Sequence, residues 1–428
     1  MPPSATGTVP ARTTPGPRRG MSALAHRNFR LFFSGQLISL IGTWMQSLAQ
    51  GWLVLQLTQD PFVLGMISAI QFLPVMVFGL FGGLIADALP KRTTLVATQT
   101  SSMLLALSLF VLTWSHQVQP WHIAVLALLL GCVNTIDMPT RQAFVVEMVG
   151  REDVVNAVAL NSAIFNTARI VGPAIAGVII GIVGVATCFL LNGLSYVAVI
   201  VGLLAMRNGD LHAVGTYRLN RTVGAVLTDL AEGLRYVRRT PVVLLAVSVV
   251  GLVSTVGMNL NVLVPVFAAD VLRAGATGFG FLMAATGVGS LVAALAIAYL
   301  GRSSPRIMLL GGAALGLLQA VLIAVNAMPV AILCMFGVGF GSIAMTATAN
   351  TSIQLAVPDN LRGRVMSVYT TVFAGSTPIG ALFAGMLAAQ FGAAIAFGVG
   401  GGVSLGVVIV AFLLARPWIL EQRRIQLA

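Results

Sequence analysis

The chain has 428 residues, of which 57% are hydrophobic and only 8% are charged. Soluble proteins carry roughly 25% charged residues, so this composition excludes a soluble globular protein and predicts one that lies in a lipid bilayer. The net charge is +12, but the arginines lie between apolar stretches instead of forming one basic domain, so no nucleic-acid partner is expected. Cys132, Cys188 and Cys334 lie far apart within apolar stretches, so we expect no disulfide framework, metal site or other cofactor.

Residues 1–25 are rich in Pro, Thr, Gly and Arg and contain no apolar run. This composition predicts a disordered cytoplasmic tail, and Met1 and Met21 are alternative start sites. The first apolar stretch, residues 31–55, is too long for the apolar region of a signal peptide. It is therefore expected to remain in the protein as a transmembrane helix.

The apolar stretches predict an all-α membrane protein, because roughly 20 apolar helical residues cross a hydrocarbon core about 30 Å thick. Twelve transmembrane helices are expected, near residues 31–55, 62–86, 93–115, 121–143, 155–182, 185–206, 241–267, 277–300, 306–327, 329–354, 364–389 and 392–415. Residues 26–206 and 241–416 would then form two six-helix bundles. A cytoplasmic linker at 207–240, with a surface helix that carries Asp229 and Glu232, would join them, and residues 417–428 would form a cytoplasmic tail.

The arginines predict how the helices are oriented, because cytoplasmic loops accumulate Lys and Arg. With the N-terminus placed in the cytoplasm, Arg273 is the one basic residue expected outside and Arg169 the one expected within the membrane. The sequence therefore predicts a multi-pass protein of the plasma (inner) membrane with both termini in the cytoplasm.

The two predicted bundles share a weak sequence repeat. Gly65 corresponds to Gly280, and Lys91 to Arg306, at one constant offset. Further along the chain, a second constant offset relates Gly177 to Gly385 and neighbouring glycines to one another. The shared offsets favour a duplication and hence two pseudo-symmetric bundles, which is a common way to build a transporter.

Polar side chains form rows on three predicted helices. In the first helix they recur at spacings of three and four residues, which places them on one face. The rows are Gln36, Ser39, Thr43, Gln46 and Gln50 in the first helix, Thr255 and Asn259 in the seventh, and Ser342, Thr346, Asn350 and Gln354 in the tenth. These groups either bond neighbouring helices or border a hydrated passage. We favour a substrate pathway, because the rows fall at matching places in the two halves.

Arg169 is expected near the bilayer midplane, about 20 Å along the fifth helix at 1.5 Å per residue. An ionisable group at that depth is costly and marks a functional site by default. The alternative is a structural ion pair with a neighbouring helix. Asp137 is the candidate acidic partner, although an i,i+4 pair with Arg141 is equally compatible with the spacing.

The loop after the second helix, with Gly83, Asp87, Lys91 and Arg92, resembles the signature loop of the major facilitator superfamily. Ala88 and Pro90 depart from the Arg and Gly of that pattern. In the family this loop latches the two halves together on the cytoplasmic side. The resemblance implies a cytoplasmic gate in which Asp87 lies near Gly363 and Arg364, and Arg92 lies near Asp137 beside Arg141.

A second motif, Gly172, Pro173 and Gly177 in the fifth helix, is similar to the Gly-Pro motif of proton-driven exporters in this superfamily. Together with the opening segment at 26–32 and residues 362–367, it makes the chain look like the enterobactin-exporter-like branch. This resemblance implies the major facilitator fold and outward transport.

The expected function is secondary active export of a small amphipathic or anionic, siderophore-like or drug-like molecule by alternating access. No G-x-x-x-x-G-K-[ST] run is present, so an ion gradient, with protons as the default, would supply the energy. Asp137 and Glu147 are the chief acids available to carry protons. Uptake, facilitated diffusion, and a transporter-like scaffold or sensor remain alternatives. No nucleophile with a base and an orienting partner is found, so an enzyme is not expected. A monomer is expected, with the lipid bilayer and a small-molecule substrate as its partners.

Overall fold

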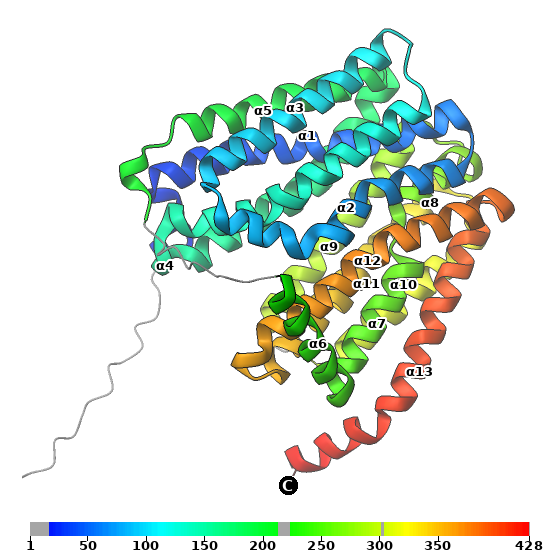
Figure 1. Cartoon of the computed structure of the whole chain (residues 1–428). Helices are drawn as coiled ribbons and strands as arrows, with labels where there is room; N and C mark the ends of the chain where they lie inside the picture. Colours follow the sequence, from blue (N-terminus) through cyan, green and yellow to red (C-terminus); the bar gives the residue numbers. More distant parts are fainter. Residues whose placement is uncertain (1–16, 213–222, 301–303, 428) are drawn as a thin grey trace, which may run out of the picture.

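The computed structural model of the chain describes residues 17–212, 223–300 and 304–427 (Figure 1). This part of the chain is helical and contains no β-strand. The first half consists of η1 (Pro17–Ala25), α1 (Arg27–Thr58), α2 (Pro61–Ala88), α3 (Lys91–Trp114), α4 (Pro120–Ile182), α5 (Val185–Leu204) and η2 (Asn208–Asp210). The second part consists of α6 (Val223–Arg239), α7 (Pro241–Gly257), α8 (Leu260–Val266), η3 (Phe267–Val271), α9 (Gly275–Leu300), α10 (Pro305–Val321), η4 (Leu322–Ala324), α11 (Met328–Ala356), α12 (Asp359–Phe391) and α13 (Ala393–Leu427).

The number of membrane spans agrees with the sequence-based prediction. Ten stretches of the described chain are long and apolar enough to cross a bilayer. One of them, α4, has 63 residues and bends at Gly150, where φ is 71°, so it supplies two spans. α1 is 32 residues long, which is long enough to cross the bilayer, but its row of polar residues keeps it out of those ten stretches. Counting both arms of α4 and adding α1 brings the total to twelve.

Three segments differ from the predicted helices. The expected disordered tail at 1–25 is helical over residues 17–25, because the Ser22 hydroxyl donates a hydrogen bond to Asp153 and the Ala23 amide donates one to Asn156 Oδ1 at 3.0 Å. The predicted helix 241–267 is interrupted at Met258 and Asn259. Finally, α13 continues as a helix through residues that were expected to form a tail.

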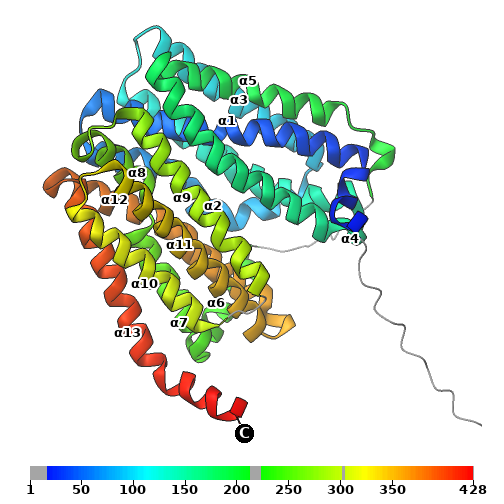
Figure 2. The ribbon, with the colours of Figure 1, turned by 180° about the vertical axis from the view of Figure 1, so that it is seen from behind.

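The helices gather in two groups. α1 to α5 lie on one side of the molecule and α7 to α13 on the other, as Figures 1 and 2 show from opposite directions. The helix ends that carry Lys91, Arg207, Arg306 and Arg362 face the same way, and we call this the basic end. The opposite end, with the connections at 59–60, 115–119, 183–184, 272–274, 325–327 and 392, is called the far end.

The hydrophobic core shows where the two groups touch. Toward the far end one continuous core contains buried residues from both groups, among them Leu53, Phe189 and Phe279. Toward the basic end there are two separate cores, one around Phe144 in the first group and one around Met308 in the second. The groups are therefore packed together at the far end and separated at the basic end.

Candidate functional site

A cavity of about 90 Å³ lies between the two groups of helices. This volume accommodates several water molecules, since one water requires roughly 10–15 Å³ by the same measure. Two of its lining residues come from the first group and the others from the second: Trp44, Arg169, Gly257, Met258, Leu260, Asn261, Met283, Thr286, Leu315, Val338 and Ser342. The cavity is thus shared by both halves of the chain, as a solute site in an alternating-access transporter would be.

Arg169 reaches this cavity from the second arm of α4. Its guanidinium carbon lies 5.9 Å from the centre of the Trp44 ring, which is within the range of a cation–π contact. The ring edge of Phe165 steadies Trp44 from another side, at 5.7 Å between ring centres. Among the described residues, the guanidinium has neither an acidic group within 4.0 Å nor a hydrogen-bond partner. The structural ion pair considered above is therefore absent from the described part of the chain.

The fifth-helix motif explains how Arg169 and Trp44 come together. A β-carbon on Gly172 would lie 2.7 Å from Trp44 Cβ and 2.8 Å from the Ile41 carbonyl oxygen, so only glycine permits this approach of α4 to α1. One turn further on, Gly177 packs against α9, and Pro173 also contacts that helix through its carbonyl oxygen. The motif therefore joins α4 to both α1 and α9.

The break between α7 and α8 forms another wall of the cavity. Non-helical backbone at membrane depth is tolerated only where its polar groups are satisfied or face a water-filled space. Here the Gly257 carbonyl accepts a hydrogen bond from Gln319 Nε2, and the Thr255 carbonyl accepts one from Asn259 Nδ2 at 2.7 Å. The break exposes Asn261, which lines both this cavity and a neighbouring one of about 50 Å³. Sequence reasoning missed Asn261, although Gly257 and Asn259 within an apolar run hinted at an interrupted helix.

The polar row of α1 divides between the two roles considered for it. Gln36 and Gln46 are buried inside the first group, where Gln46 Oε1 accepts a hydrogen bond from Asn192 Nδ2 at 2.6 Å. Gln50 instead lines the smaller cavity and donates to Gln71 Oε1 at 3.0 Å. Thr43 is exposed and donates to a backbone carbonyl of its own helix. Within this row, Gln46 therefore bonds a neighbouring helix, whereas Gln50 lines a cavity.

The row on α11 runs from the cavity toward the basic end. Ser342 lines the cavity, Thr346 is half-buried one turn further on, and Asn350 accepts a hydrogen bond from the more exposed Gln354. Asn259, expected with this set, is buried and supports the helix break through its bond to Thr255. The polar row of α11 is thus more continuous than that of α1, because it leads from the cavity toward the basic end without turning into the helix group.

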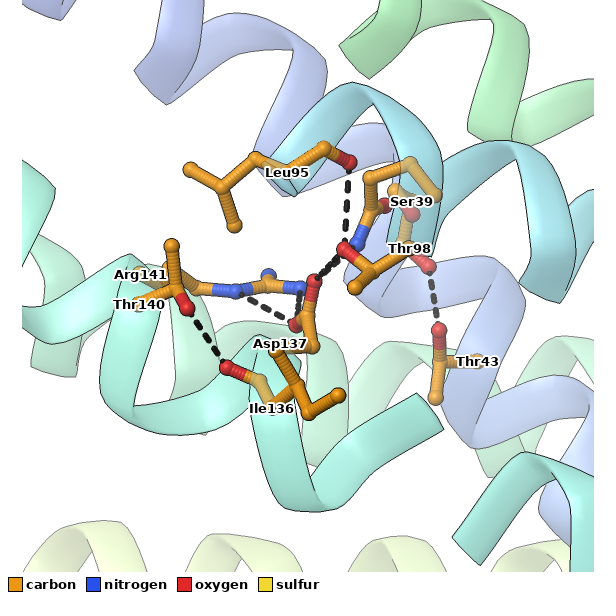
Figure 3. A network of polar contacts seen from close by, with 9 residues as sticks. Ser39, Thr43, Leu95, Thr98, Ile136, Asp137, Thr140 and Arg141 are labelled. Carbon is orange, nitrogen blue, oxygen red and sulfur yellow. Dashed lines mark hydrogen bonds and ion pairs between the residues drawn. The ribbon is translucent and has the colours of Figure 1, made fainter. Parts of the chain in front are cut away.

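Asp137 belongs to a separate polar network within the first group (Figure 3). Its carboxylate accepts hydrogen bonds from Thr98 Oγ1 at 2.7 Å, from Gln99 Nε2 at 2.8 Å and from the Arg141 guanidinium. The i,i+4 pair with Arg141 is therefore the one that forms. Asp137 does not serve as the acidic partner of Arg169, because its lone pairs are directed to α3 and to its own helix.

In this structure Arg92 bonds the end of α5, and the described residues form no bond between Arg92 and Asp137. Arg92 donates to the Leu203 carbonyl at 2.8 Å and to the Leu204 carbonyl at 2.9 Å, and it also contacts Asn208. A cation at a helix C-terminus satisfies carbonyls that have no partner within the helix, which explains why Arg92 prefers the end of α5. The adjacent Lys91 pairs with Glu147, with 3.1 Å between Nζ and Oε1.

Arg364 also has partners that the sequence did not suggest. Its Nε lies 2.7 Å from Asp229 Oδ1, and its Nη1 contacts Glu232, so both acidic partners come from α6. The side chain of Asp87 lies outside the described part of the chain. The latch would place Gly83 and Gly363 against the opposite group of helices. A β-carbon built on either glycine has no neighbour within 4 Å. Among the described residues, no latch contact forms at Gly83, Gly363 or Arg364, at the end where the hydrophobic cores of the two groups are separate.

The described residues contain no cluster of three or more His, Cys, Asp or Glu side chains that could hold a metal ion. The chemistry that the central cavity offers is that of a binding site, with one cation, several amide and hydroxyl groups, and an apolar wall. No described residue there combines a nucleophile with a base.

Solved structures share this fold at low sequence identity. A peptide transporter of the POT type aligns with a TM-score of 0.71 and 14% identity, covering 91% of this chain and 94% of the other. A bacterial homologue of the iron transporter ferroportin, in an inward-facing state, aligns with a TM-score of 0.66 and 17% identity, covering 92% and 98%. At these identities the likeness establishes the major facilitator fold alone.

Sequence relatives extend the comparison to function. The chain is 25% identical to the staphyloferrin A transporter of Staphylococcus aureus over 90% of this chain and 96% of that protein. It is 29% identical to the multidrug efflux pump Tap of Mycolicibacterium fortuitum over 81% and 86%. Residues 19–424 match the family described as transmembrane secretion effector. The chain therefore belongs to this family of membrane transporters within the major facilitator superfamily.

Proposed function

We propose that the protein is a secondary active exporter of small amphipathic or anionic molecules, working by alternating access between the bundles 26–206 and 241–416. The observation that carries the proposal is the cavity at Arg169, which both bundles line and which lies where they begin to separate. A rocking motion of one bundle against the other would expose such a site to each side in turn. Both bundles belong to one chain, so a monomer suffices.

The basic end is proposed to face the cytoplasm, with both termini on that side of the inner membrane. Support comes from the positive-inside rule, because Lys91, Arg151, Arg207, Arg306 and Arg362 all lie at helix ends of this side. On this assignment the molecule is open to the cytoplasm and sealed on the outside. Export then begins with solute entering from the basic end.

The proposed gate must form at the basic end when the far end opens. Gly83, Asp87, Lys91, Arg92, Asp137, Arg141 and Arg364 remain our candidates for it. Within the described residues, the ion pairs of Lys91 and Arg141 join partners inside the first bundle, and those of Arg364 join α12 to α6. Closure therefore requires at least Arg364 to leave its present partners or to carry α6 with it.

Proton coupling is part of the proposal, with Asp137 as the favoured carrier. Among the described Asp and Glu residues, Asp137 is the only buried one. Buried acids within the membrane are typical of proton relays. Its bond to Arg141 offers a partner that would be released when the carboxylate takes up a proton. Glu147, paired with Lys91, is the second candidate.

Reconstitution into proteoliposomes tests the function. Purified protein is inserted in vesicles, a proton gradient is imposed, and movement of a panel of cationic, neutral and anionic fluorescent compounds is followed. Export predicts gradient-driven movement in the direction opposite to the protons, which an uncoupler abolishes. Movement with the protons in the direction of uptake would favour an uptake permease, and movement that ignores the uncoupler would favour facilitated diffusion. Absence of transport for every compound would favour a scaffold or sensor.

A further inference from the structure

The central cavity contains one charge and nothing among its described neighbours to balance it. We propose that Arg169 binds a carboxylate of the transported molecule, so that the substrates include organic anions with an apolar body. This inference rests on the proposed export function and narrows its substrate class. It concerns the solute itself and not the coupling ion.

The first step of the argument is electrostatic. A charged group at membrane depth is costly unless it is paired or hydrated, and Arg169 is the only charged residue among those that line the cavity. Asp137, the acidic partner that the sequence suggested for Arg169, already accepts hydrogen bonds from Thr98, Gln99 and Arg141. An anion that enters the cavity is therefore attracted to the Arg169 guanidinium, and no described carboxylate competes with it for this group.

The second step concerns geometry. The guanidinium presents five N–H donors in a planar fork that matches a carboxylate with two parallel hydrogen bonds. In this structure the described residues take none of those donors, and the ring of Trp44 holds the guanidinium from one side only. The donors are thus free for a ligand, while the stacking restricts the number of conformations that binding must immobilise.

The third step concerns the rest of the cavity wall. Met258, Met283 and Leu315 form an apolar surface, whereas Thr286, Ser342 and Asn261 supply polar groups. Flexible thioether side chains adapt to ligands of different shape. The composition suits a carboxylate attached to an apolar or aromatic body better than a small inorganic ion, which would leave the apolar wall unused.

Equilibrium binding to the full-length protein in detergent tests the inference, with 1-naphthoate as the anionic probe and 1-naphthamide as its neutral match. Calorimetry is expected to show at least tenfold tighter binding of the carboxylate. Arg169→Gln should remove most of that difference between the two probes, and Arg169→Lys should restore part of it, because the charge returns without the planar fork of donors. Equal affinity of the wild type for both probes would overturn the inference, whether or not the variants fold.

A chloride titration separates an organic anion site from a site for inorganic ions. If 0.1 M potassium chloride displaces naphthoate completely while the same ionic strength of potassium methanesulfonate, which has no carboxylate, does not, the site is one for small inorganic anions and the inference is wrong. The vesicle panel distinguishes failure of the inference from failure of the function. Transport confined to cationic and neutral compounds would refute a carboxylate substrate and leave the exporter intact, whereas loss of all transport would refute both.

Discussion

Gly65 of α2 and Gly385 of α12 cross so closely that a β-carbon built on either would lie 3.1 Å from the α-carbon of the other. Gly177 of α4 and Gly280 of α9 make the corresponding crossing, at 3.0 Å and 2.9 Å. The sequence repeat relates Gly65 to Gly280 and Gly177 to Gly385, so the two crossings are equivalent contacts of the duplicated halves. Small residues allow this close helix packing without a hydrophobic driving force.

Gly385→Leu should open the far end. The added side chain meets backbone of α2, and overpacking of this kind costs about 1–3 kcal/mol, which shifts a two-state balance by about 5- to 150-fold. Spin labels on cysteines at the exposed positions 117 and 326, in a background without native cysteines, should report a longer far-end distance. Transport should fall in parallel.

Gly402→Leu is the matched control for that experiment, because a β-carbon at this exposed position of α13 would have open space around it. It should leave both the label distance and transport unchanged. An unchanged far-end distance in Gly385→Leu would contradict the role assigned to the glycine crossing.

Arg364→Gln should loosen α6 from α12. The substitution removes the contacts with Asp229 and Glu232, and a partly exposed ion pair contributes about 0.2–1 kcal/mol. Backbone amides of α6 should therefore exchange hydrogen up to about fivefold faster. Arg362→Gln serves as control, because Arg362 pairs with the exposed Asp359 of its own helix; equal effects of both substitutions would refute a specific anchor.

Asp137→Asn should lower stability and, if Asp137 carries the proton, abolish coupling. The amide cannot replace the charge that faces Arg141, and hydrogen bonds to charged groups contribute about 1.5–3 kcal/mol. The thermal midpoint in detergent should fall by several degrees, and transport should no longer respond to the imposed proton gradient. Asp359→Asn, at an exposed carboxylate, should change neither quantity. Gradient-driven transport by Asp137→Asn would exclude it as the carrier.

Gln319→Leu should destabilise the broken helix at the central cavity. The Gly257 carbonyl would lose its donor inside the protein, and a buried polar group left without a partner costs about 1–3 kcal/mol. We expect a lower thermal midpoint and weaker binding of naphthamide and naphthoate alike, since the α7–α8 wall moves for both. Gln117→Leu, at an exposed position of the far end, controls for the change in polarity. A selective loss of naphthoate binding would show that Gln319 acts on the anion instead.

The sequence by itself determined which stretches span the membrane and that there are twelve spans. Lipid cannot satisfy an exposed backbone amide, so each span must be a long apolar helix, and this requirement is visible locally in 62–86 or 277–300. The glycine repeat and the signature motifs also depend on chain positions alone, which is why the family could be predicted before any contact was known.

Only the tertiary structure decided which partner each polar group meets. Gln46 bonds Asn192 and Arg364 bonds α6, although the spacing of the polar row favoured a shared pathway and the family resemblance implied a latch. The interruption at Met258 likewise depends on a donor, Gln319, that is distant in the chain. Helix periodicity specifies the face on which a side chain lies, but the neighbour that covers that face comes from segments far apart in the sequence, and its position depends on which state the two bundles have adopted.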